Sequence, residues 1–186
     1  MKNVFSWIWL FIKSIFTSKS KDSSDLPHFR QVRPNVIASG QPTPTGFHKL
    51  KEMFPGRKIT VVKLNFPTEG SDDEARNIGI TVLDCGIMPR TGFKGVIQVA
   101  EDEFKMPDPK VWATVIQEIL KIPAVDDGEG LWLFHCVNGN DRTNLAIGHV
   151  RRLVDKWTKE QALKEMVTQG YHWELVGLDR KWAELA

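Results

Sequence analysis

A short apolar segment followed at once by a polar, glycine-containing turn constrains the fold of this chain more than any other feature. The apolar segment spans residues 131–134, and the turn that follows reads His135-Cys136-Val137-Asn138-Gly139-Asn140-Asp141-Arg142-Thr143. This pattern predicts a buried strand, a tight loop and a helix that begins near Arg142. It places a cysteine, five intervening residues, an arginine and a hydroxyl side chain in one loop.

These residue types suit the binding and attack of a phosphate group. A free cysteine has a pKa of about 8.5 and becomes a thiolate at neutral pH in electropositive surroundings. The backbone N–H groups of a strand-to-helix turn provide such surroundings. Arg142 can hold two phosphate oxygens with its planar fork, and Gly139 permits the tight curve.

We therefore predict that Cys136 is a nucleophile in a phosphate-binding loop, with Arg142 and Thr143 as further catalytic residues. Thr143 would hydrogen-bond the sulfur and ease its departure, and His135 would brace the cysteine backbone from behind. The predicted phosphate-binding residues are Val137, Asn138, Gly139, Asn140, Asp141 and Arg142.

The loop resembles the signature loop of the cysteine-dependent phosphatase superfamily, which includes protein tyrosine, dual-specificity and phosphoinositide phosphatases. The order Gly-x-Asp-Arg-Thr is more similar to the atypical dual-specificity and lipid-phosphatase-like branches than to receptor-type tyrosine phosphatases. Asn140 departs from the lysine that lipid phosphatases often carry, and Asn144 from the glycine that commonly follows the threonine. The resemblance implies a phosphocysteine intermediate without metal or cofactor; a non-catalytic phosphate-binding module is the weaker alternative.

The rest of the chain alternates apolar segments with helical patterns. We predict strands at residues 36–38, 59–64 and 80–84, besides the one before the cysteine. Helices are expected at residues 46–54, 71–78, 109–122 and 142–157, and a capping box at 158–161 opens another. The sequence predicts a single α/β domain over residues 27–186, with a mainly parallel central sheet flanked by helices. Ligands bind at the carboxyl ends of such strands, where Cys136 lies.

A second resemblance lies in the amino-terminal half of this domain. Ile37-Ala38-Ser39-Gly40-Gln41-Pro42 and the strand end Lys63-Leu64-Asn65 are similar to bacterial and fungal atypical dual-specificity phosphatases. With the loop, the resemblance covers roughly residues 32–170. It implies a tyrosine or dual-specificity protein phosphatase first, and an inositol polyphosphate or phosphoinositide phosphatase as the alternative.

A phosphatase of this kind also needs an acid that protonates the leaving oxygen. The family resemblance places it before the helix that leads into the cysteine strand, where Glu101, Asp102, Glu103 and Asp108 are found. Asp102 is the best match, because Asp-x-Phe-x-x-Pro resembles the dual-specificity acid loop. Asp108 precedes Pro109 and is expected to cap the helix instead.

Composition narrows the function classes further. A net charge of +2 over 186 residues is too small to indicate a nucleic-acid partner. With Cys85 and Cys136 as the two cysteines, neither a disulfide framework nor a zinc site is suggested. Cys85 is expected to be a small core residue, and the alternative is a reversible disulfide with Cys136.

The first 26 residues form a separate segment of apolar residues and a polar linker. Residues 4–16 contain Ser6 and Lys13 and fall short of the roughly 20 apolar residues that span a bilayer. Three interpretations remain open: a helix lying in an anionic membrane surface, a secretory signal with Ser18-x-Ser20 as its cleavage site, and a helix packed on the domain or a partner. Membrane contact or export is favoured over a plain cytoplasmic location.

Overall fold

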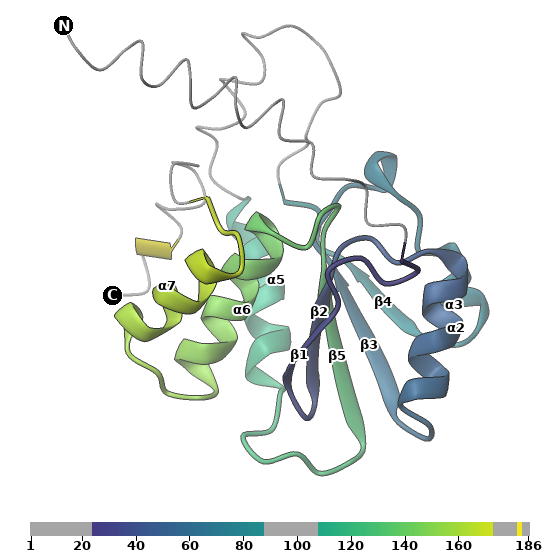
Figure 1. Ribbon diagram of the computed structural model, residues 1–186, viewed down its shortest axis with the longest axis horizontal. Coiled ribbons are helices and arrows are strands. Elements are labelled where there is room, and N and C mark those ends of the chain that lie inside the picture. Colours follow the sequence, from purple (N-terminus) through teal and green to yellow (C-terminus); the bar gives the residue numbers. More distant parts are fainter. Residues whose placement is uncertain (1–23, 88–107, 173–181, 184–186) are drawn as a thin grey trace, which may run out of the picture.

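The computed structural model describes residues 24–87, 108–172 and 182–183. In this part of the chain a five-stranded sheet lies between helices on both faces (Figure 1). The strand order is β1-β2-β5-β3-β4, with β1 antiparallel to β2 and all other neighbours parallel. The strands are β1 (Arg30–Arg33), β2 (Val36–Ser39), β3 (Lys58–Lys63), β4 (Thr81–Asp84) and β5 (Gly130–His135).

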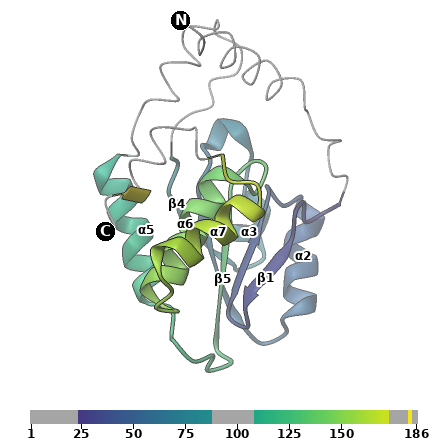
Figure 2. The same cartoon turned by 60° about the vertical axis from the view of Figure 1, so that its left-hand side comes forward.

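Helices α2 (Pro44–Met53) and α3 (Asp73–Asn77) cover one face of the sheet. On the other face lie α5 (Pro109–Leu120) and α6 (Asp141–Leu153), and α7 (Lys159–Thr168) packs against α6, as Figure 2 shows from the side. A short 3-10 helix, η1 (Pro67–Glu69), follows β3. The two layers enclose two separate apolar clusters, one on each face.

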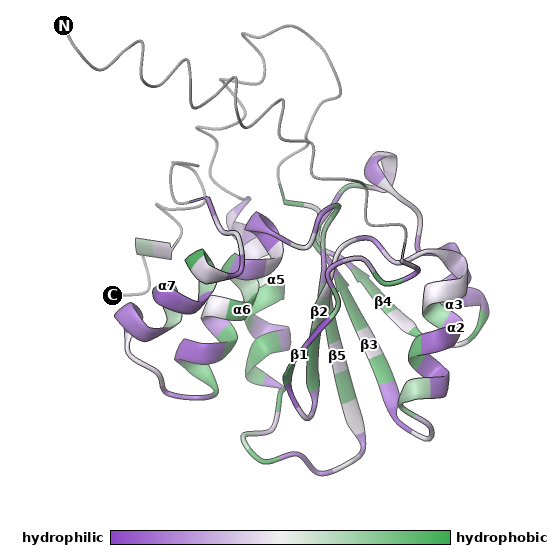
Figure 3. Ribbon diagram, in the orientation of Figure 1, coloured by the Kyte–Doolittle hydropathy of each residue, from purple (hydrophilic) through white to green (hydrophobic). Residues whose placement is uncertain are grey.

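The alternation of side chains along β5 decides which residues face which layer. Leu131 and Leu133 belong to the cluster under α2, whereas Phe134 and Cys136 belong to the cluster under α5 and α6. Successive side chains of a strand point to opposite faces, so His135 points towards the α2 and α3 layer. The central strands β2, β5 and β3 consist mostly of hydrophobic residues (Figure 3), as expected of a parallel sheet buried on both faces.

The predicted fold class is confirmed. Each predicted strand and helix is present, with ends that differ by a few residues. The helix predicted to reach residue 157 ends at Leu153, and Lys156 beyond it has a φ of 59°, which a helix does not allow. Strand β1 was not predicted, because three of its four residues are polar. The domain boundary near residue 26 stays a prediction, since the first 23 residues lie outside the described ranges.

Gly148 brings α6 close to its neighbours, and its replacement tests the packing of this layer. A Cβ atom there would lie 2.3 Å from Met166 Sδ and 2.9 Å from Trp182 Cζ3. We expect Gly148→Leu to lower the free energy of unfolding by about 1–3 kcal/mol through overpacking, measured by denaturant unfolding. Ala113→Leu adds a similar side chain on the exposed face of α5 and should change it by less than about 0.5 kcal/mol. Equal losses of unfolding free energy for Gly148→Leu and Ala113→Leu would contradict the close packing of α6 at Gly148.

Candidate active site

Cys136 directly follows β5, the strand that lies between β2 and β3 in the sheet. The loop after it rests on the turn that follows β2: Gln41 N donates to Val137 O at 3.0 Å. Gly139 has a φ of 75°, and a Cβ atom there would lie 2.7 Å from Gly40 N. The glycine is therefore needed for both the conformation and the close approach. Asp141 begins α6 immediately afterwards, so the loop joins a strand end to a helix N-terminus as predicted.

Arg142 is buried, and its guanidinium is held by Glu69. Nη1 and Nη2 donate to the two carboxylate oxygens of Glu69 at 2.8 and 3.1 Å. Nη1 also donates to Ile87 O at 3.2 Å and approaches Leu64 O at 3.4 Å. Burial disfavours the charged form, but the Glu69 hydrogen bonds and the charges of Cys136 and nearby carboxylates raise the pKa of Arg142 above its ordinary value. A bidentate pair of this kind fixes the orientation of the fork.

Glu69 was not identified from the sequence. It ends η1, the turn after β3, and its carboxylate also accepts a hydrogen bond from Phe66 N at 2.9 Å. Strand β3 pairs with β5, so the segment after β3 lies beside the segment after β5. An acidic residue soon after the neighbouring strand is the sequence signal that could have pointed to it.

Behind the loop, three charged or ionisable side chains form a buried group with polar neighbours. Asp72 Oδ2 lies 2.8 Å from His135 Nε2, and Asp72 Oδ1 lies 3.6 Å from Lys63 Nζ. Gln41 Nε2 donates to Asp72 Oδ1 at 2.7 Å, and Asn65 Nδ2 donates to Gln41 Oε1 at 2.9 Å. We call Lys63, Asp72 and His135 the buried triad.

The charges of the buried triad are paired within the protein. All three side chains are at most 2% exposed. Burial raises the pKa of the Asp72 carboxyl, but the His135 and Gln41 hydrogen bonds and the Lys63 charge outweigh it, so the pKa lies below its ordinary value. His135 was predicted to brace the cysteine backbone; in the structure its Nε2 pairs with the Asp72 carboxylate. The residue before Cys136 is therefore anchored to the start of α3.

The remaining predicted loop residues differ in their surroundings. Asp141 Oδ1 accepts from the backbone N of His172 and lies 2.8 Å from its Nδ1. Thr143 is fully buried, and its hydroxyl has no hydrogen-bond partner among the described residues. Asn138 is exposed, and Val137 and Asn140 are partly buried. The role of Thr143 towards the sulfur stays a prediction.

The proposed acid, Asp102, lies outside the described residues, and so do Glu101 and Glu103. Asp108 is described, and it caps α5 as predicted. Its Oδ1 accepts from Lys110 N at 2.7 Å and from Val111 N at 3.4 Å. The assignment of the acid therefore stays a prediction, whereas the capping role of Asp108 is confirmed.

Cys85 is buried, as expected of a core residue. Burial, with the nearby Glu118 and Asp84 charges, raises the pKa of its thiol to about 11. The described ranges hold no group of three or more His, Cys, Asp or Glu side chains arranged for a metal ion. No helix in these ranges is long and apolar enough to cross a membrane, and residues 4–16 lie outside them.

The chain is similar to several solved phosphatase structures. Tk-PTP in its active form is 20% identical, with a TM-score of 0.61 over 85% of this chain and 97% of that one. PTPMT1 in complex with PI(5)P is 15% identical, with a TM-score of 0.58 over 84% and 96% of the two chains. TpbA of P. aeruginosa in complex with pTyr is 19% identical, with a TM-score of 0.52 over 88% and 95%. The chain has the protein tyrosine phosphatase fold. No family model and no curated protein matches it.

The buried triad predicts a pH-dependent contribution to stability. Asp72→Asn leaves Lys63 without its counter-charge, so we expect a loss of about 3 kcal/mol in the free energy of unfolding at pH 7. Because the pKa of Asp72 is lowered in the folded protein, its contribution is full at neutral pH and is lost as the pH falls through that lowered pKa. Denaturant unfolding at pH 7 and in the acid range below the ordinary carboxyl pKa measures both effects.

Asp73→Asn is the matched control for this measurement. Its side chain is 80% exposed and pairs with Arg76 on the surface, so the same charge change should cost less than about 1 kcal/mol. A loss for Asp73→Asn as large as that for Asp72→Asn would contradict a special role of the buried triad.

Proposed function

We propose that this protein hydrolyses phosphate monoesters through a phosphocysteine intermediate formed on Cys136. The observation that carries the proposal is the buried pair of Arg142 and Glu69 beside a cysteine loop that joins β5 to the N-terminus of α6. A guanidinium offers five N–H donors, so Glu69 can hold one edge of the fork while another edge binds phosphate oxygens. An arginine held in this way is preorganised to stabilise charge on a transferring phosphoryl group.

The chemistry follows in two steps. The Cys136 thiolate attacks phosphorus, the bond to the leaving oxygen breaks, and Asp102 gives that oxygen a proton. Asp102 then accepts a proton from the water that attacks the phosphocysteine, and the thiolate leaves while phosphate is released. Throughout, Arg142 and the backbone N–H groups of residues 137–142 bind the non-bridging oxygens. Thr143 stabilises the departing sulfur in the second step.

The substrate class that we propose is a phosphotyrosine-containing or dual-specificity protein substrate. Asn140 and Asp141 stand in the loop, so the loop itself adds no cation for a second phosphate. The similarity to TpbA, which was solved with pTyr, supports this choice. The similarity to PTPMT1, which was solved with PI(5)P, keeps a phosphoinositide or inositol phosphate as the alternative. Phosphate release from a panel of phosphopeptides and inositol phosphates separates the two classes.

The proposed reaction makes Cys136 and Arg142 indispensable. Cys136→Ser should abolish turnover of p-nitrophenyl phosphate and still bind tungstate, because serine keeps the size but does not ionise near neutral pH. Arg142→Lys should lose most of the turnover and most of the tungstate binding, since an ammonium does not reproduce the planar fork of the guanidinium. Mass spectrometry of an acid-quenched single turnover should show phosphate on Cys136. Tungstate binding by the wild-type protein without turnover or a phosphocysteine would instead show a non-catalytic phosphate-binding module.

The proposed acid, Asp102, is tested by how strongly its loss depends on the leaving group. Protonation matters most for poor leaving groups, so Asp102→Asn should lower kcat at least about tenfold more for an alkyl phosphate than for p-nitrophenyl phosphate. It should also flatten the alkaline limb of the pH profile, because that limb reports loss of the protonated acid. Asp108→Asn is the control, since asparagine caps a helix as well as aspartate does. If Asp108→Asn shows these effects and Asp102→Asn does not, the assignment is wrong.

A further inference from the structure

A second arginine reaches the phosphate loop from the edge of the sheet. Arg30 opens β1 and pairs with Ala38 of β2, whose side chain belongs to the cluster under α5 and α6. Arg30 Nη2 donates to Asn144 Oδ1, and Nη1 approaches Gly139 O at 3.5 Å. The contact to Gly139 is made to a carbonyl oxygen, so Arg30 holds the loop from its outer side rather than entering the phosphate site.

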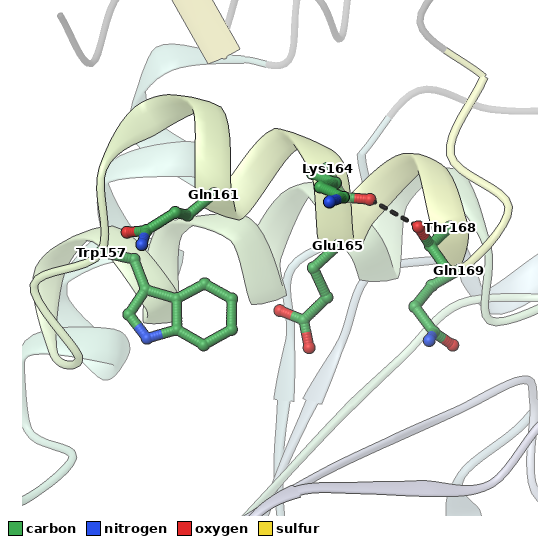
Figure 4. Close-up of a pocket in the computed structure, with 6 residues that line it drawn as sticks. All are labelled: Trp157, Gln161, Lys164, Glu165, Thr168 and Gln169. Atoms are coloured by element: carbon green, nitrogen blue, oxygen red, sulfur yellow. Dashed lines mark hydrogen bonds between the residues drawn. The ribbon is translucent and has the colours of Figure 1, made fainter.

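Asn144 explains why the contact exists in this chain. It stands where the resemblance leads us to expect a glycine, and a glycine has no side chain to receive Arg30. Its Nδ2 donates to Gln169 O at 2.8 Å, at the C-terminal end of α7. Gln169 also lines, with Glu165, a hollow along α7 (Figure 4). Arg30 and Asn144 therefore tie the loop to an edge strand and to the end of α7.

The Arg30 guanidinium also lies within electrostatic reach of Cys136. Burial lowers the pKa of the Arg30 guanidinium, while the charges of Glu165 and Cys136 work in the opposite direction. Among the described residues, the charged or titratable groups near the loop also include Arg142 and Asp141 of α6, His135 of β5, Glu69 of η1, and Asp72 and His172, which contact His135 and Asp141. Among these, Arg142 is already paired with Glu69, and Arg30 faces the loop from another direction.

We propose that Arg30 is a positioning residue of the phosphate loop, which it holds through Gly139 and Asn144 while its charge favours the Cys136 thiolate. This inference rests on the proposed function, because it assigns Arg30 a part in the same reaction. Arg30 would then contribute in two ways, through its charge and through the shape of its contacts, and a lysine substitution distinguishes them. The positive charge acts on the thiolate and is retained by a lysine. The contacts of Nη1 with Gly139 and of Nη2 with Asn144 shape the loop, and a lysine does not reproduce this pair of contacts.

The test compares three variants of the full chain: Arg30→Met, Arg30→Lys and the control Gln31→Met, which changes an exposed residue of the same strand. The first measurement is the pH at which Cys136 reacts at half its maximal rate with iodoacetamide, followed on the Cys136 peptide by mass spectrometry. The second is the affinity for tungstate by calorimetry. Thermal unfolding shows which variants are folded.

Arg30→Met should move the alkylation midpoint upward by about half a unit to one unit, because a nearby positive charge is lost. It should also weaken tungstate binding about tenfold, as expected for losing a charge-assisted hydrogen bond. Arg30→Lys should keep the midpoint within about 0.3 units of the wild type and still weaken tungstate binding. Gln31→Met should change neither quantity.

Asn144→Gly provides a second route if Arg30→Met does not fold. It keeps the Arg30 charge but removes its anchor, so tungstate binding should weaken several-fold. Wild-type values in every folded variant of Arg30 and Asn144 would overturn the inference and leave the proposed function intact. A wild-type Cys136 that alkylates like a free cysteine, in a protein that binds no tungstate, would overturn the proposed function itself.

Discussion

A buried arginine needs a counter-charge, and the candidate active site depends on that requirement. Removing one partner of a buried ion pair typically costs 3–5 kcal/mol, because the other charge is left without compensation. Glu69 supplies the counter-charge for Arg142, and the carbonyl oxygens of Leu64 and Ile87 contribute further acceptors. Those groups come from the segments after β3 and β4. The geometry of the cysteine loop is therefore set as much by the ends of the neighbouring strands as by the loop itself.

The opposite face of the sheet holds the loop through different chemistry. Cys136 faces the layer of α5 and α6, while His135 faces the other layer. There His135 pairs with Asp72, which in turn pairs with Lys63. Consecutive residues at the end of β5 are thus held by opposite layers, which leaves the strand end little freedom to rotate. A lysine, an aspartate and a histidine are costly to bury unless they are paired. Here they are paired with one another, and the pairing anchors the residue before Cys136 to the start of α3.

Sequence periodicity predicted the elements of the fold but not the pairs that hold the site. Buried strands such as β3 and β5 and the amphipathic helix α5 have clear patterns, and the Cys136 loop carries its own residues in one continuous segment. Glu69 and Asp72 act on Arg142 and His135 across 73 and 63 residues of chain. No local pattern reports such pairings, because they depend on which strands are neighbours in the sheet. The short polar strand β1 was missed for the related reason that an edge strand does not need an apolar pattern.

Most of the positively charged side chains described near the loop are paired with other groups of the protein. Their pairing bears on which substrates the site suits. Arg142 is paired with Glu69, and Lys63 with Asp72. Arg30 contacts the loop from its outer side. At the loop itself, Asp141 adds a carboxylate that is held by His172. Within the described residues, then, the loop has Arg142 for one phosphate and no lysine beside it for another. This charge distribution supports the proposed substrate class, a single phosphate on an uncharged ring as in phosphotyrosine, over the alternative of a densely phosphorylated inositol.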